Sequence, residues 1–272
     1  MVPLSLIFGA LVGLSLGLTG GGGAIFAVPL LVYGLGVDTR DAVAISLAAV
    51  GATSFVGFVH RWKLGEVEVR TGLLFAIAGM LGAPVGTWIA SLIPEVALLL
   101  LFAGLMIVVA ARMWQQASRS PVNKQECPDP DSANGPTCQR DAFGVLVMNS
   151  RCAVLLLVAG VLTGVLSGAF GVGGGFVIVP ALMLFSGMAI HRAVGTSLMV
   201  IALVSVSGVA SQLLAGRTIS AVVTVLFIIG GIGGMFVGQR IGRQLSGPTL
   251  QKVFVVAILV VAVFVIIRNL NL

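Results

Sequence analysis

Charged side chains are scarce in this chain of 272 residues. They make up only 9% of it, against roughly 25% in ordinary soluble domains. Residues 1–37 contain no Asp, Glu, Lys or Arg, and neither do residues 152–190. Apolar residues reach 58%, which is more than a water-soluble fold could bury. The scarcity of charge therefore excludes a soluble globular protein and favours an integral membrane protein.

Cysteine and histidine are also rare, which limits the chemistry that the chain can perform. The three cysteines are Cys127, Cys138 and Cys152, and the two histidines are His60 and His191. Neither histidine stands at a metal-ligand spacing from the cysteines, and a basic loop on the cytoplasmic side would keep the thiols reduced. We expect free thiols, no metal site, no catalytic residue and no cofactor.

In place of charge the chain has a series of apolar runs. Apart from the two charge-free stretches, such runs lie near 42–59, 71–93, 96–114, 193–214, 218–238 and 250–267. A membrane-spanning helix needs about 20 predominantly apolar residues. The sequence therefore predicts an all-α, polytopic integral membrane protein with about eight membrane helices.

One polar segment of any length interrupts this pattern, at residues 115–150. It contains four prolines among Asn, Asp and Ser residues, a composition typical of a solvated linker. It divides the chain into a first transmembrane repeat at 1–114, the linker at 115–150 and a second transmembrane repeat at 151–272.

The two halves share a glycine cluster that occurs twice. A constant spacing of 151 positions relates Gly17, Gly20, Gly22, Gly23, Val28 and Pro29 to Gly168, Gly171, Gly173, Gly174, Val179 and Pro180. The same spacing relates Ser46 to Ser197, Gly65 to Gly216, Gly79 to Gly230 and Gly82 to Gly233. We interpret the chain as an internal duplication. Paired interruptions in two membrane halves are the best sequence indication of a transporter's binding site.

Each charge-free stretch is too long for one straight span and short for two. As a broken helix that crosses once, it gives eight spans and splits the basic residues 10 to 5 between the two sides. As a re-entrant hairpin, it gives three crossings per half, inverted halves and a split of 12 to 3. Because Lys and Arg collect on the cytoplasmic side, the steeper split favours hairpins, with both termini in the periplasm. The crossing arrangement stays open at this point.

The glycine breaks suit a small anion. A half-helix that begins at a break leaves N–H groups unpaired, and the partial positive charge there attracts anions. The predicted spans contain no Asp or Glu, and their two basic residues, Arg112 and Lys252, stand near the ends of two runs, so the spans lack a buried carboxylate for a cation. Neutral donors are available instead at Thr19, Ser46, Thr53, Ser54, Ser167, Thr196, Ser197 and Ser205.

We predict that the substrate is bound by residues at and beside the two breaks. They are Thr19, Gly22, Gly23, Ser46, Gly173, Gly174, Gly175, Thr196 and Ser197. Packing is the competing interpretation, because glycines let membrane helices approach closely and helix hydroxyls often bond back to their own carbonyls.

A polar group also closes the helical run at 42–59. His60 and Arg61 could line the substrate path, whereas Arg61, Trp62 and Lys63 together are typical of an anchor at the membrane surface. Ser211 and Gln212 stand 151 positions after His60 and Arg61.

These motifs resemble the sulfite exporter TauE/SafE family of membrane permeases. The resemblance rests on the glycine-rich break with Val-Pro downstream, at Gly20–Pro29 and Gly171–Pro180, and on Ala193-Val194-Gly195-Thr196-Ser197. The first half has a degenerate copy, Ala42-Val43-Ala44-Ile45-Ser46, which lacks the Gly-Thr pair. The resemblance implies a bacterial inner-membrane carrier for small sulfur-containing anions such as sulfite, sulfoacetate or other organosulfonates.

We therefore expect a secondary transporter, acting as an exporter by alternating access, with a small anion and the lipid bilayer as its partners. The net charge of +6 comes from scattered loop residues and does not indicate nucleic acid. An intramembrane enzyme and a structural membrane subunit are the alternatives. Small-residue faces could join two copies into a homodimer or pack the two halves together.

Overall fold

A computed structural model of the chain describes residues 2–118, 150–171, 175, 178–179, 181–182, 188, 190–217, 220–242 and 247–270. All regular secondary structure in these residues is helical, so the predicted all-α class is confirmed. The long helices are α1 (Val2–Thr19), α3 (Thr39–Lys63), α4 (Val69–Leu92), α5 (Glu95–Ser118), α6 (Ser150–Phe170), α8 (Ile190–Leu214), α9 (Ala221–Gly242) and α10 (Gly247–Leu270). Short helical turns follow α1, namely η1 (Gly22–Phe26), α2 (Ala27–Pro29) and η2 (Leu30–Gly34).

Five helical segments among the described residues are long and apolar enough to cross a membrane. They are Thr39–Lys63, Val69–Leu92, Ala153–Phe170, His191–Leu214 and Ala221–Gly242. Length and apolar composition are what the bilayer core demands of a span. The chain is therefore a polytopic membrane protein.

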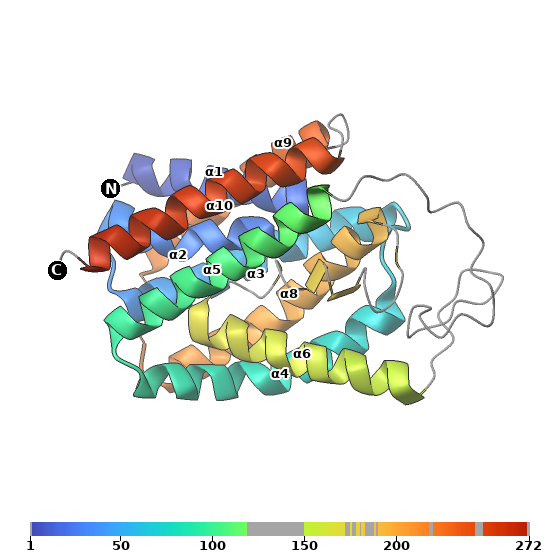
Figure 1. The fold of residues 1–272 in the computed structure, drawn as a ribbon, viewed down its shortest axis with the longest axis horizontal. Coiled ribbons are helices and arrows are strands. Elements are labelled where there is room, and N and C mark those ends of the chain that lie inside the picture. The colour runs from blue at the N-terminus through green and yellow to red at the C-terminus, as the bar shows by residue number, and fades with distance from the viewer. Residues whose placement is uncertain are drawn as a thin grey trace.

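The first charge-free stretch forms a hairpin. Gly20 has a φ of 76°, a left-handed conformation that glycine adopts readily, and the chain reverses there. Beyond it, Gly23 packs against the backbone of Leu16, and Gly34 packs against the ring of Phe8. Residues 22–34 thus run back along α1, as Figure 1 also shows. Most of the corresponding residues 172–189 lie outside the described part.

Helices of opposite halves pack tightly on each other through glycines. Helix α1 lies along α9, and α6 lies along α4. A Cβ on Gly13 would lie on the carbonyl of Gly231, and a Cβ on Gly164 would lie on the carbonyl of Gly79. Such backbone-to-backbone approach is what small residues allow in membrane helices. The small-residue faces therefore pack the two halves together within one chain.

The glycines that make these contacts differ by one position from the predicted spacing. Gly13 and Gly164 stand 151 positions apart, whereas Gly231 and Gly79, which they contact, stand 152 positions apart. Likewise Gly82 and Gly234 both lie on a backbone carbonyl, whereas a Cβ on Gly233 would meet nothing within 4 Å. The spacing rises by one because the segment from Gly216 to the start of α9 is one residue longer than the segment from Gly65 to the start of α4.

The centre of the molecule is the crossing of α3 and α8. Of the five candidate spans these two are the most buried: 67% of the apolar stretch of α3 and 72% of that of α8 lie inside the protein. They run antiparallel, because Gly57 faces Leu198 while Gly208 faces Leu47. At the crossing, a Cβ on Gly51 would lie 2.6 Å from the Cβ of Ser205.

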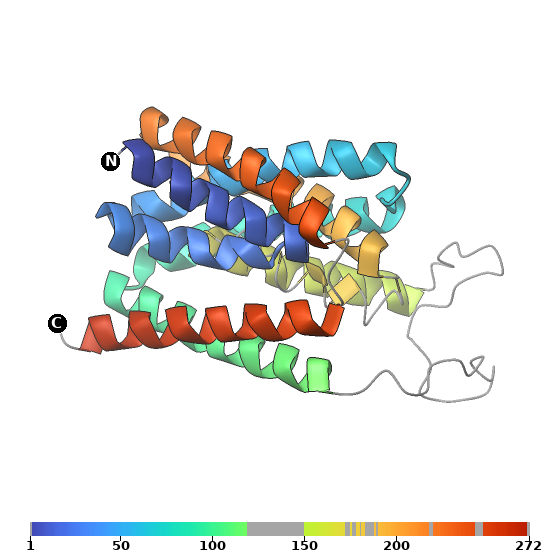
Figure 2. The ribbon, with the colours of Figure 1, turned by 90° about the horizontal axis from the view of Figure 1, so that it is seen from above.

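The two ends of the molecule can be named from the chain's own landmarks. The terminal end carries the start of α1 and the end of α10, and the linker end carries the end of α5 and the start of α6 (Figures 1 and 2). Between the first hairpin and the linker the chain runs three times from one end of the molecule to the other, as α3, α4 and α5. This is the arrangement in which the basic residues divide 12 to 3.

Candidate functional site

The two glycine breaks are held by a reciprocal pair of serine hydroxyls. Ser46 of α3 donates to the carbonyl of Gly171 at 2.6 Å, and Ser197 of α8 donates to the carbonyl of Gly20 at 2.6 Å. Both serines are completely buried. The two bonds join positions that are 151 apart on each side. Each half therefore fixes the break of the other half.

Two valines press on the same breaks. A Cβ on Gly20 would meet the side chain of Val194, and a Cβ on Gly171 would meet Val43, which again lie 151 positions apart. Gly171 has a φ of 71°, close to that of Gly20. Space and backbone conformation thus both require glycine at these two positions.

The breaks also meet each other. A Cβ on Gly21 would lie 2.7 Å from the Cα of Gly175. Among the predicted binding residues, Gly175 is therefore in backbone contact with the opposite break, and Gly23 is packed against α1. Gly22 lies in η1, and Gly173 and Gly174 lie outside the described residues.

The two predicted threonines are already engaged elsewhere. Thr19 donates to the carbonyl of Ser15 in its own helix at 2.8 Å. Thr196 accepts a hydrogen bond from the backbone N–H of Glu68 at 3.0 Å, which ties the start of α8 to the loop between α3 and α4. The structure brings Ser46, Ser197, Gly23 and Gly175 to the two breaks and places Thr196 at the linker end.

Three buried hydroxyls have no hydrogen-bond partner in the described part of the chain. They belong to Ser54, Ser167 and Ser205, each at most 2% exposed. Ser54 and Ser205 are 151 positions apart, and both lie at the crossing of α3 and α8, because Ser54 is one helical turn from Gly51. Their recurrence at that spacing was the sequence signal that could have added them to the predicted site.

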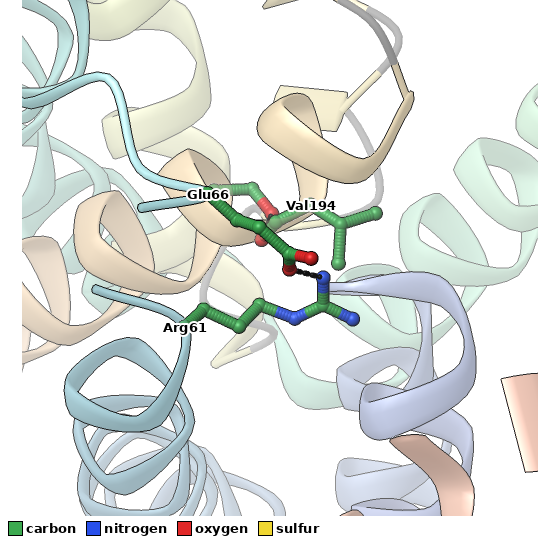
Figure 3. A network of polar contacts seen from close by, with 4 residues as sticks. Arg61, Glu66 and Val194 are labelled. Carbon is green, nitrogen blue, oxygen red and sulfur yellow. Dashed lines mark hydrogen bonds and ion pairs between the residues drawn. The ribbon is translucent and has the colours of Figure 1, made fainter. Parts of the chain in front are cut away.

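At the linker end, a partly buried ion pair stands beside the first break. Arg61 is 7% exposed, and its Nη1 lies 2.7 Å from Oε2 of Glu66. Figure 3 shows the pair beside Val194, the valine that presses on Gly20. The expectation that Arg61 anchors the protein at the membrane surface is therefore wrong. Trp62, which is 57% exposed and stacked on Phe58, is free to do so.

One cleft among the described residues is apolar. It has a volume of about 470 Å³ and lies between α1, residues 26–34 and α10, where Leu11, Phe26, Tyr33 and Phe264 line it. Apolar walls of this kind offer nothing to an oxyanion, which needs donors. Within the described residues, no three His, Cys, Asp or Glu side chains are grouped as metal ligands.

Comparison with known proteins gives a consistent picture. The sequence profile described as "Sulfite exporter TauE/SafE" matches residues 5–265. A probable membrane transporter protein of Xylella fastidiosa (strain 9a5c) is 37% identical over 268 residues, covering 96% of this chain and 93% of the relative. A probable membrane transporter protein of Bacillus subtilis (strain 168) is 28% identical, covering 97% of this chain and 94% of that relative. No solved structure matches the chain.

Proposed function

The chain belongs to the sulfite exporter TauE/SafE family of membrane transporters, and from this premise we propose that it exports small sulfur-containing oxyanions across the bacterial inner membrane. Sulfite, sulfoacetate and other organosulfonates are the proposed substrates. The mechanism is secondary transport by alternating access, driven by an ion gradient or by the substrate's own gradient.

One observation carries the proposal of an anion as cargo. Ser54 and Ser205 place two unpartnered hydroxyls at the buried crossing of α3 and α8. A buried hydroxyl without a partner costs about 1–3 kcal/mol. An oxyanion that accepts from both hydroxyls would recover this free energy. The proposed site has no fixed positive charge, and the hydroxyl protons of the two serines are its hydrogen-bond donors to the anion.

The backbone at the breaks supplies further donors in this proposal. Gly22, Gly23, Gly173, Gly174 and Gly175 direct N–H groups toward the substrate once the two breaks separate. Ser46 and Ser197 hold the breaks in the closed arrangement and, when a break moves away, turn their hydroxyls to the anion. Thr19 and Thr196 stand next to the same breaks, and in this proposal they join the set once their present bonds to Ser15 and Glu68 are released.

Alternating access follows in this proposal from an inverted internal repeat. The crossed serine bonds at positions 151 apart, and the matching packing of α1 on α9 and of α6 on α4, support such a repeat. Gly20 is held near the start of α8, at the linker end, whereas Gly171 is held near the start of α3, at the terminal end. Releasing one serine bond at a time would open one end at a time.

The test is transport by the purified full-length protein in liposomes, with sulfite and sulfoacetate as probes. The double variant Ser54→Ala/Ser205→Ala should lose at least tenfold in transport rate, because it removes both central donors. Its thermal stability should be unchanged or slightly higher, since the two unsatisfied hydroxyls are gone.

Ser211→Ala is the matched control, because its hydroxyl only bonds back to the carbonyl of Ser207 at 2.8 Å. It should transport within about twofold of the parent. Full transport by the double variant would remove the central serines from the site. A parent protein that hydrolyses sulfur esters in detergent without transporting would favour an enzyme, and one that does neither would favour a structural subunit.

A further inference from the structure

A small cavity with several polar side chains in its lining lies beside the second break, at the terminal end. Its volume is about 20 Å³, room for about one water molecule. Ala169 of α6 lines it close to Gly171, and so do residues of α3, α4, α5 and the segment after α8. The lining includes Arg40, Thr87, Ser91, Gln212 and Arg217.

The hydrogen-bond donors of this cavity are neutral in its buried part and charged in its more exposed part. Gln212 and Thr87 are buried, and both point at the carbonyl of Gly168, at 3.3 Å and 3.5 Å. Arg40 and Arg217 are half-buried. Neutral donors therefore lie next to the break, and guanidinium groups lie nearer the solvent.

The positive charge of the cavity is only partly neutralised. The Nε of Arg40 lies 3.6 Å from Oε1 of Glu95, a partly exposed pair that offers little stabilisation. Arg217 forms no ion pair with any carboxylate in the described residues. A guanidinium binds oxyanions through paired N–H groups, which gives it both charge and geometry for that ligand.

The distribution of basic residues makes this cavity stand out. In the hairpin arrangement only Arg40, Arg217 and Arg268 lie on the terminal side, against twelve basic residues on the other. Two of those three line one cavity. The preference of basic residues for cytoplasmic loops cannot account for them, because they lie on the opposite side.

We propose that this cavity is the outer docking site of the transported oxyanion, with Arg40 and Arg217 as its charged donors and Gln212 leading to the second break. The proposal rests on the proposed function of the chain as an oxyanion carrier. In the present conformation the anion binds at the mouth between the two arginines, because the enclosed part holds only about one water molecule.

The test compares Arg217→Gln with Arg192→Gln in the full-length protein. Arg192 is an exposed arginine at the start of α8, at the linker end, so its loss serves as the charge-matched control. In liposomes, Arg217→Gln should raise the KM for sulfite applied at the terminal side about tenfold, the worth of one charge-assisted hydrogen bond. Its kcat should change little, and Arg217→Lys should restore part of the affinity.

A second measurement separates this proposal from the transport function itself. Sulfite binding to the detergent-purified protein is measured by calorimetry, with choline as a cationic control. Unchanged KM and unchanged binding in Arg217→Gln would overturn the docking site while leaving the carrier intact. Sulfite binding that is lost in Arg217→Gln, together with no transport by the parent protein, would keep the site and overturn the carrier.

Discussion

The two breaks are held by the same serine contact, yet the side chains around them differ in charge. At the linker end, Gly20 packs against Val194, and Val194 lies beside Arg61, whose charge is neutralised by Glu66 (Figure 3). At the terminal end, the positions 151 further along are Gln212 and Arg217, and here the cavity keeps an arginine without an ion pair in the described residues. The linker end thus has the ion pair of Arg61 and Glu66, whereas the terminal end has the amide of Gln212 and the unpaired guanidinium of Arg217 among the described residues.

This difference distinguishes residues that hold the breaks in place from residues that differ between the two ends. Glycine, serine and valine recur at both breaks because backbone conformation and close packing leave no alternative there. Arg61 and Glu66 form an ion pair at the linker end, whereas Gln212 and Arg217 line a small cavity at the terminal end. The side chains at the two ends therefore differ, although the serine contacts that hold the breaks are alike.

The largest expected effect concerns topology, because the comparison depends on which end of the molecule faces the periplasm. We predict that both termini are periplasmic and that residues 115–150 are cytoplasmic, because the basic residues then divide 12 to 3 in the direction that membrane insertion favours. A phosphatase reporter fused after Leu272 should be active, and a fluorescent reporter there should stay dark. The opposite pattern, with the linker exposed to the periplasm, would reverse the two ends and place the arginine cavity inside.

Removing the side chain of Arg61 should lower the free energy of unfolding. Arg61→Met leaves the partner carboxylate of Glu66 without its cation. We expect a loss of about 3 kcal/mol, somewhat below the cost in a fully buried pair, because the Glu66 side chain is 29% exposed. Gln212→Met should cost only about 1 kcal/mol, since Thr87 still reaches the same carbonyl. Thermal unfolding in detergent measures both.

The double variant Arg61→Met/Glu66→Gln is the control for that experiment. It removes both charges and should recover most of the stability lost in Arg61→Met, because no carboxylate remains uncompensated. Equal losses for Arg61→Met and Gln212→Met would mean that the ion pair contributes nothing special at the linker end.

Much of this fold could be predicted from the sequence, because the membrane restricts the choices. Lack of charge and apolar runs of span length predict helices, and the glycine clusters predict where α1 turns back. The split of basic residues favoured the hairpin that residues 22–34 adopt. What a spacing of 151 could not predict was the exchange between halves, in which each serine binds the other break.

The site was harder to predict, since it depends on which side chains already have partners. Ser46 and Ser197 lie at the breaks, where their hydroxyls bond carbonyls, and their contact with a substrate stays a prediction. Ser54 and Ser205 looked like any other helix hydroxyls until the fold showed that they do not bond back to their own helix. Arg61 looked exposed because it follows the apolar run, whereas α3 continues to Lys63 and the start of α8 covers it.

The smallest expected effect sharpens the comparison most, because it concerns the one contact that both ends share. Ser46→Ala and Ser197→Ala each leave a buried carbonyl, of Gly171 or Gly20, without its hydroxyl donor. We expect each to cost about 1–2 kcal/mol, with Ser197→Ala at the lower end of this range, because the single hydroxyl proton of Ser197 is shared with the carbonyl of Val194 at 2.8 Å. Thermal unfolding of the two variants and their sulfite transport rates measure this, with Ser211→Ala as the shared reference. A markedly larger cost for Ser197→Ala would mean that the neighbouring ion pair depends on this bond, so that the linker end is closed by one coupled network rather than by two separate contacts.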